Sequence, residues 1–203
     1  MKSRLATASL PLLILLLAGC SSSSDDSSSA VGINEGTREQ VASVADQGDG
    51  NVITKGGCMD SDVLEERLIE LVNEARSTPQ QCGDVTFPAA SAVSWSERAE
   101  AAAWAHSSEM ASLTMFTHTG SNGSNVGDRL TVTNYRWRYA AENLAFGYGT
   151  PEGAVQGWML SPGHCEKIMS TNVTEIGVSC ADSAGEGDQS RRYWTQVLAS
   201  PRS

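Results

Sequence analysis

The sequence predicts an α+β fold in which helices cover a mostly antiparallel sheet. Apolar residues recur at helical spacing through residues 62–75 and 96–113. Near the end of the chain, residues 174–181 and 192–199 form two short apolar segments, and the second alternates in polarity at the two-residue period of a strand. The Gly/Asp-rich loop SAGEGDQS joins them. Helices followed by late, hairpin-connected strands are typical of the α+β class.

Local signals place the helix starts. Asp62 with Glu65 is similar to a capping box. Ser96 can cap a second helix that runs to about residue 113. Thr150-Pro151 and Ser161-Pro162 each pair a capping residue with proline at the first helical position, and their helices run to about residues 160 and 169. The remaining expected elements are a short strand at 92–95 and a short helix at 128–134.

Residues 1–19 have the plan of a secretory signal peptide. Lys2 and Arg4 precede an apolar run from residue 10 to residue 17. That run is too short for a membrane-spanning helix, which needs roughly 20 apolar residues. The sequence therefore predicts export.

Cys20 follows Leu-Ala-Gly, an arrangement that resembles the lipobox of bacterial lipoproteins. In those proteins the cysteine is acylated and becomes the first mature residue, and its acyl chains hold the protein at a bilayer. Ser21 after the cysteine resembles lipoproteins that Gram-negative bacteria send to the outer membrane. The predicted location is the bacterial cell envelope, with the membrane as a partner through the N-terminal lipid. An exported protein with an unmodified Cys20 is the alternative.

Composition divides the rest of the chain into a tether and one domain. Residues 20–57 are rich in Ser, Asp and Gly and contain no aromatic residue, so they cannot bury enough surface to offset chain entropy. Residues 58–203 are long enough for one domain with a core. The formal net charge is −10, and −12 without Lys2 and Arg4. An acidic chain disfavours nucleic acid as a partner, and we expect a monomer.

Four cysteines fall within the domain: Cys58, Cys82, Cys165 and Cys180. An even number in an exported protein predicts two disulfides, for which three pairings are open. Local pairing, Cys58–Cys82 and Cys165–Cys180, is the simplest of the three. The sequence contains no CxxC or HExxH motif, so the usual zinc and redox spacings are missing.

The three histidines and one carboxylate are the candidates for chemistry. His106 lies on the apolar side of its helix and is predicted to be a hydrogen-bonded core histidine. His118 and His164 fall in loops or helix starts, and Glu142 lies between them in an apolar stretch. If these three side chains converge, they would suit a divalent metal such as zinc, or a proton relay. Otherwise their hydrogen bonds would only fix loops.

Four segments in register carry a family resemblance: FTHTGSNGSNVGDRL, AAENLAFGYGTPEGAVQGWMLSPGHCEKIM, TEIGVSC and YWTQVLA. Together they resemble the bacterial branch of the CAP superfamily, which includes cysteine-rich secretory proteins, antigen 5 and pathogenesis-related proteins. The resemblance covers about residues 62–199. It implies a three-layer α-β-α sandwich with a central cleft lined by His118 and Glu142, and it adds His164 from the SPGH segment.

Two positions depart from the eukaryotic members of that family. Those members carry a second cleft glutamate where this chain has Ser161, and a strand histidine where it has Tyr193. His164 is a candidate replacement for one of the lost residues. Tyr193 and Glu175 are candidates to contact and position the residues that line the cleft. Glu175 is also consistent with a solvated residue at a strand edge.

These residues lead to three hypotheses of function. The first is a non-enzymatic binding module that presents the His/Glu cleft to a ligand or envelope protein, since no complete set of nucleophile, base and orienting group is found. The second is a metal-dependent hydrolase or peptidase that uses His118, Glu142 and His164 around zinc. The third is a structural role in which the cleft has no function.

Overall fold

The computed structural model describes residues 61–184 and 191–203. The predicted signal peptide, Cys20, the tether and Cys58 lie outside these residues. Within them, no helix is both long and apolar enough to cross a bilayer.

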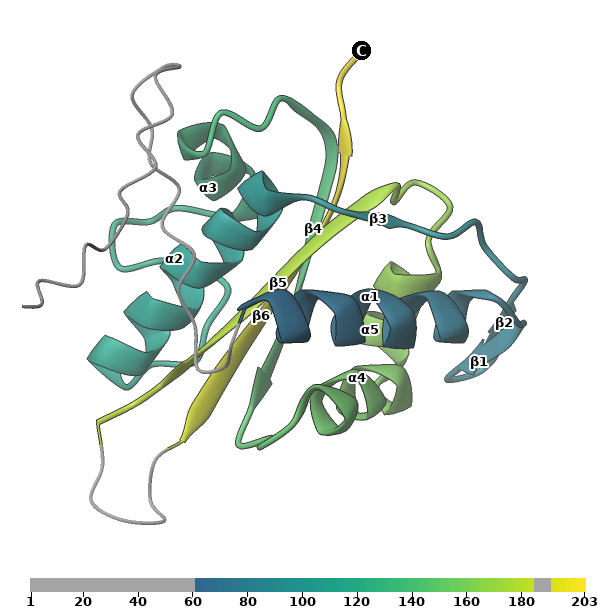
Figure 1. The fold of residues 1–203 in the computed structure, drawn as a ribbon, viewed down its shortest axis with the longest axis horizontal. Helices are drawn as coiled ribbons and strands as arrows, with labels where there is room; N and C mark the ends of the chain where they lie inside the picture. The colour runs from purple at the N-terminus through teal and green to yellow at the C-terminus, as the bar shows by residue number, and fades with distance from the viewer. Residues whose placement is uncertain (1–60, 185–190) are drawn as a thin grey trace, which may run out of the picture. The chain divides into compact units, whose positions relative to one another are not determined.

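A four-stranded sheet forms the centre of the domain (Figure 1). Its strand order is β3-β5-β6-β4, and β4 is an edge strand. The β5–β6 and β6–β4 pairs are antiparallel, whereas the short β3 pairs in parallel with β5. The predicted mostly antiparallel sheet is therefore confirmed. The strands are β3 (Ser94–Trp95), β4 (Trp137–Phe146), β5 (Glu175–Asp182) and β6 (Arg192–Pro201).

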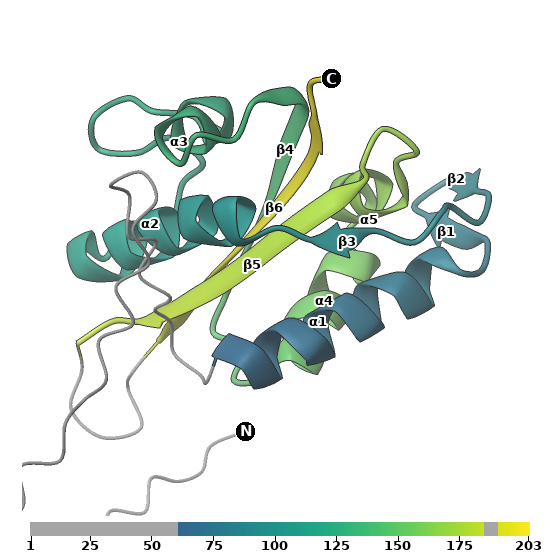
Figure 2. The same cartoon turned by 45° about the horizontal axis from the view of Figure 1, so that its top comes forward.

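Helices cover both faces of this sheet, so the domain has three layers, as expected (Figure 2). One face carries α2 (Glu97–Leu113), with α3 (Val126–Val132) beside it. The opposite face carries α1 (Ser61–Arg76), α4 (Pro151–Leu160) and α5 (Pro162–Met169). A separate hairpin of β1 (Gln80–Cys82) and β2 (Val85–Phe87) contacts α5.

Strand β6 shows how one segment serves both cores. Trp194 and Leu198 belong to the larger core, which packs against α1, α4 and α5. Val197 and Ala199 belong to the core beneath α2 and α3. Successive side chains of a strand point to opposite faces, and β6 is buried on both.

Most of the expected elements are confirmed. Ser96 caps α2 by accepting a hydrogen bond from Ala99 N, and Thr150 caps α4. Ser161 precedes α5 without a side-chain capping bond. The helix expected at 128–134 begins earlier, at Val126, because Asn125 forms a capping box with Asp128. The β1–β2 hairpin and β4 were not expected as strands.

The disulfides differ from the local pairing expected from sequence. Cys82 of β1 is bonded to Cys165 of α5, with their Cα atoms 5.5 Å apart. Both predicted pairs, Cys58–Cys82 and Cys165–Cys180, are therefore wrong. Cys180 is itself disulfide-bonded, but not to Cys165. The pairing is set by tertiary packing, because the β1–β2 hairpin packs on α5 and brings Cys82 next to Cys165. Cys180 is nearer to Cys165 in the sequence but is not its partner.

Glycine permits the close approach of α2 to the sheet. Gly177 of β5 faces the start of α2, and a Cβ at this position would lie 2.0 Å from the Glu100 backbone nitrogen and 2.3 Å from the Ala99 carbonyl carbon. The inner face of α2 is also made of small residues, because Ala99, Ala102 and Ala103 are fully buried. This small-residue contact sets the spacing of the two layers.

We expect Gly177→Ala to lower the free energy of unfolding by about 3 kcal/mol, because the added methyl meets backbone that cannot move without displacing α2. Gly163→Ala is the matched control, since a Cβ there meets nothing within 4 Å; it should change stability by less than about 1 kcal/mol. Urea unfolding followed by circular dichroism measures both. Equal stability of the two variants would contradict the close packing of α2 on β5.

Candidate functional site

A buried carboxylate on the edge strand organises the candidate site. Glu142 lies in β4, and its side chain is only 3% exposed. Its Oε1 accepts a hydrogen bond from His118 Nδ1 at 2.8 Å. Its Oε2 accepts one from Arg129 Nη2 at 2.6 Å. The structure therefore brings His118 and Glu142 together, as the resemblance implied.

His118 is the accessible member of this group. It lies in the loop between α2 and α3, and its side chain is 56% exposed. A carboxylate only accepts, so we assign the proton of the neutral ring to Nδ1. Nε2 then carries a lone pair at the outer end of the ring. Glu142 thus orients an imidazole that can accept a hydrogen bond from a bound molecule.

Arg129 is the functional residue that the sequence analysis missed. It lies in α3 and is 7% exposed, and besides Glu142 it donates to the carbonyl oxygens of His118 at 3.2 Å and Ser124 at 3.0 Å. It therefore neutralises the carboxylate and holds the His118 loop. Its place in the sequence was a clue to this role, because Arg129 lies in the short helix that directly follows the loop carrying His118.

His106 lies behind the pair and is fully buried. Its Nε2 donates to the Thr117 carbonyl at 2.8 Å, which confirms the predicted core histidine with a hydrogen bond. The same nitrogen is 3.9 Å from Glu142 Oε1, and Nδ1 is 3.6 Å from Glu109 Oε2. His106 thus anchors the segment that leads to His118.

Strand β4 also holds the α5 side of the site. Lys167 Nζ donates to the Glu142 carbonyl at 2.9 Å. The Asn143 side-chain amide donates to the His164 carbonyl at 3.2 Å and to Gln196 Oε1 at 2.9 Å. Two consecutive residues, Glu142 and Asn143, therefore tie the His118 loop on one face of the sheet and α5 on the other.

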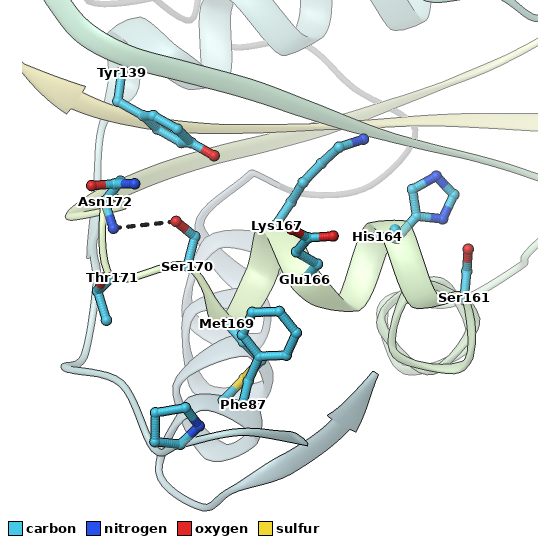
Figure 3. Close-up of a pocket in the computed structure, with 12 residues that line it drawn as sticks. Phe87, Tyr139, Ser161, His164, Glu166, Lys167, Met169, Ser170, Thr171 and Asn172 are labelled. Atoms are coloured by element: carbon cyan, nitrogen blue, oxygen red, sulfur yellow. Dashed lines mark hydrogen bonds between the residues drawn. The ribbon is translucent and has the colours of Figure 1, made fainter. Parts of the chain in front are cut away.

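His164 lies next to this group in a groove. Burial is the largest cause that lowers its pKa, and Coulombic interactions with Lys167 and then with His118 lower it further. The groove has a volume of about 720 Å³ and runs along α5 (Figure 3). Its lining comprises Phe87, Pro88, Tyr139, Ser161, Gly163, His164, Glu166, Lys167, Met169, Ser170, Thr171 and Asn172. His118 and Glu142 are not part of that lining.

Comparison with known proteins identifies the family. Residues 69–198 match the cysteine-rich secretory protein family, abbreviated CAP. The chain belongs to the CAP family. Its relatives include the uncharacterized protein YkwD of Bacillus subtilis, 30% identical over 132 residues that make up 65% of this chain and 45% of that protein. The uncharacterized membrane protein YlbC of the same organism is 28% identical over 50% of this chain and 27% of its own length.

Solved structures confirm the CAP fold. An extracellular protein with an SCP domain from Bacillus anthracis matches 68% of this chain and 41% of its own, with a TM-score of 0.53 and 22% identity. An outer surface protein from Borrelia burgdorferi matches 72% of this chain and all of its own, with a TM-score of 0.56 and 16% identity. At these identities the likeness concerns the fold alone.

The CAP-family arrangement in this chain does not fit a zinc ion well. Among residues 61–184 and 191–203, no three His, Cys, Asp or Glu side chains are grouped so that they could hold a metal. Glu142, the central ligand of the expected set, is bound on both oxygens, one of them to the cation of Arg129. A metal at this position would have to compete with a guanidinium group.

The two predicted supporting residues make their described contacts elsewhere. Tyr193 is buried in β6, and its ring packs against Phe146 with centroids 4.7 Å apart. Glu175 starts β5 and lies beside the Tyr135 phenol, whose pKa is raised by burial and by that carboxylate. These contacts are with Phe146 and Tyr135, and a supporting role for Tyr193 and Glu175 in the cleft stays a prediction.

We expect His164 to make stability depend on pH. Its folded pKa lies below the usual 6.5, so the unfolded chain binds the proton first as the pH falls. The contribution of the neutral ring is fully present above about pH 6.5 and is lost as the pH falls from there towards the folded pKa. His164→Gln should flatten the slope of unfolding free energy against pH in that window, whereas Gln156→Ala on α4 should keep it. An unchanged slope in His164→Gln would contradict the prediction.

Proposed function

We propose that this chain is an exported, lipid-anchored CAP protein of the bacterial envelope that binds a ligand in the groove along α5. The signal-like residues 1–19 and Cys20 support export and anchoring. Relatives described as extracellular or outer-surface proteins support a location outside the cytoplasm. This chain aligns with less than half the length of each of the two Bacillus subtilis relatives, so the ligand of the whole protein is also part of the proposal.

The observation that carries the binding proposal is the chemistry of the groove. One part offers apolar and aromatic surface from Phe87 and Tyr139, and another offers His164, Glu166 and Lys167 (Figure 3). Binding sites for small molecules combine apolar lining with a few fixed polar groups. A neutral imidazole supplies one donor and one acceptor, and an ammonium supplies up to three donors. The groove therefore suits a ligand with an apolar body and a polar head.

The polar groups of the site support binding more than catalysis. Nucleophilic catalysis needs a hydroxyl or thiol activated by a base. Cys165, which follows His164 directly, is oxidised in a disulfide, and the His118 ring is paired with a carboxylate. Glu142 has a partner on each oxygen and is buried. No contact among the described residues favours the metal-dependent hydrolase, so we propose binding.

Profiling the purified protein against lipids, peptides and glycans tests the groove. For the class that binds, we expect His164→Ala to weaken affinity about tenfold, the loss of one hydrogen bond in a desolvated site. Gln156→Ala, on the exposed surface of α4, is the matched control and should leave affinity unchanged. Unchanged binding in a His118→Ala, His164→Ala double variant would contradict the proposal. Chelator-sensitive hydrolysis of any probe would favour the hydrolase instead.

We expect Cys20→Ala to release the protein from the membrane, because the acyl chains would provide its attachment. Fractionation of cells that express either form, with detection by antibody, measures this directly. Palmitate labelling of the parent protein is the control for acylation. A Cys20→Ala variant that still sediments with the membrane would contradict the lipid anchor without affecting the groove.

A further inference from the structure

Strand β4 begins beside the end of β6, near the C-terminus (Figure 1). A second pocket is formed by residues at this place. Its volume is about 720 Å³, and it shares no lining residue with the groove along α5. Three of its residues are arginines, which is unexpected in a chain of net charge −10. The lining comprises Thr131, Asn134, Tyr135, Arg136, Trp137, Arg138 and Arg202.

The backbone gathers the three arginines from segments far apart in the sequence. The register of β4 against β6 shifts between Trp137 and Tyr139, so Arg138 is the extra residue of a β-bulge. Beyond the end of β6, the Arg202 backbone nitrogen donates to the Arg136 carbonyl at 2.7 Å. The backbones of Arg136 and Arg202 are therefore neighbours, one just before β4 and the other just after β6. Arg138 follows Arg136 by two residues, within β4.

Trp137 gives the pocket a fixed aromatic surface. Its indole nitrogen donates to the Gly127 carbonyl at 2.9 Å and lies 3.3 Å from Thr131 Oγ1. A Cβ at Gly127 would lie 2.6 Å from the indole Cζ2, so glycine there lets the ring lie against α3. The residue remains 38% exposed. The ring is thus oriented by α3 and still accessible from solvent.

The three guanidinium groups of the pocket differ from those arginines of the chain that are held in ion pairs. Arg67 pairs with Glu70 and Glu152, and Arg192 pairs with Asp182. Within the part of the chain that the structure describes, no ion pair involves Arg136, Arg138 or Arg202. All three are exposed. Like charges held around one pocket repel each other unless an anion enters between them.

We propose that this pocket binds a phosphate-bearing ligand. Planar guanidinium groups bond phosphate oxygens in pairs, and arginine is the preferred residue for such recognition. A phosphate monoester carries up to two negative charges, whereas a single carboxylate carries one and would leave most of the arginine charge unbalanced. The exposed face of Trp137 would contact the organic part next to the phosphate.

Pyrophosphate and phosphatidylglycerol vesicles are the two probes, because the phosphate could be soluble or part of a lipid headgroup. The protein carries Cys20→Ser in every sample, so that no acyl chain contributes. At low ionic strength, calorimetry should detect pyrophosphate binding that weakens as salt is added. Vesicle sedimentation, with phosphatidylcholine vesicles for comparison, measures the headgroup. Binding to pyrophosphate alone identifies a soluble ligand, and binding to phosphatidylglycerol vesicles alone identifies the lipid.

Variants that remove the same charge at different places distinguish binding by the pocket from attraction by the overall charge of the protein. Arg136→Gln and Arg138→Gln should each weaken binding about tenfold, the loss of one charge-assisted hydrogen bond. Arg138→Lys should recover only part of the loss, since an ammonium lacks the two-pronged geometry. Arg67→Gln removes the same charge from α1 and should bind as the parent does. The proposal is overturned if neither probe binds, or if Arg67→Gln weakens binding as much as the pocket variants.

Discussion

The buried ion pair between Glu142 and Arg129 is the interaction on which the candidate site depends. A carboxylate that is 3% exposed is stable in its charged form only when partners compensate for the lost water. Arg129 supplies the opposite charge, and His118 supplies a second hydrogen bond. Breaking such a buried pair typically costs about 3–5 kcal/mol. The same contacts fix the loop that carries His118, so site geometry and local stability have one origin.

The position of β4 at the sheet edge extends this constraint to both layers. The Glu142 side chain reaches the α2 and α3 layer, while its carbonyl accepts from Lys167 of α5. The next residue, Asn143, points the other way and holds the His164 carbonyl. An edge strand leaves backbone groups available that a central strand uses for pairing. The two histidine-bearing segments are therefore positioned by consecutive residues, and this places His164 in the α5 groove while His118 stays outside its lining.

Local signals accounted for most of the helices and for the late hairpin. Ser96 and Thr150 cap helices where expected, because capping depends only on residues within one turn. Strand β4 was harder to predict. Its buried half reads AAENLAF, where Glu142 and Asn143 interrupt the apolar pattern. The two polar residues are stable there because of partners on other elements, and no short window of sequence contains those partners.

The sequence by itself determined the fold class through local periodicity and the family through motifs kept in register, and only the family resemblance implied that His118 and Glu142 line one cleft. Only the tertiary structure decided the partners that depend on long-range packing. Arg129 became the counter-ion of Glu142 because α3 packs beside β4. Cys82 bonded Cys165 because the β1–β2 hairpin packs on α5. Periodicity records which side of an element is buried, but not which distant element covers it.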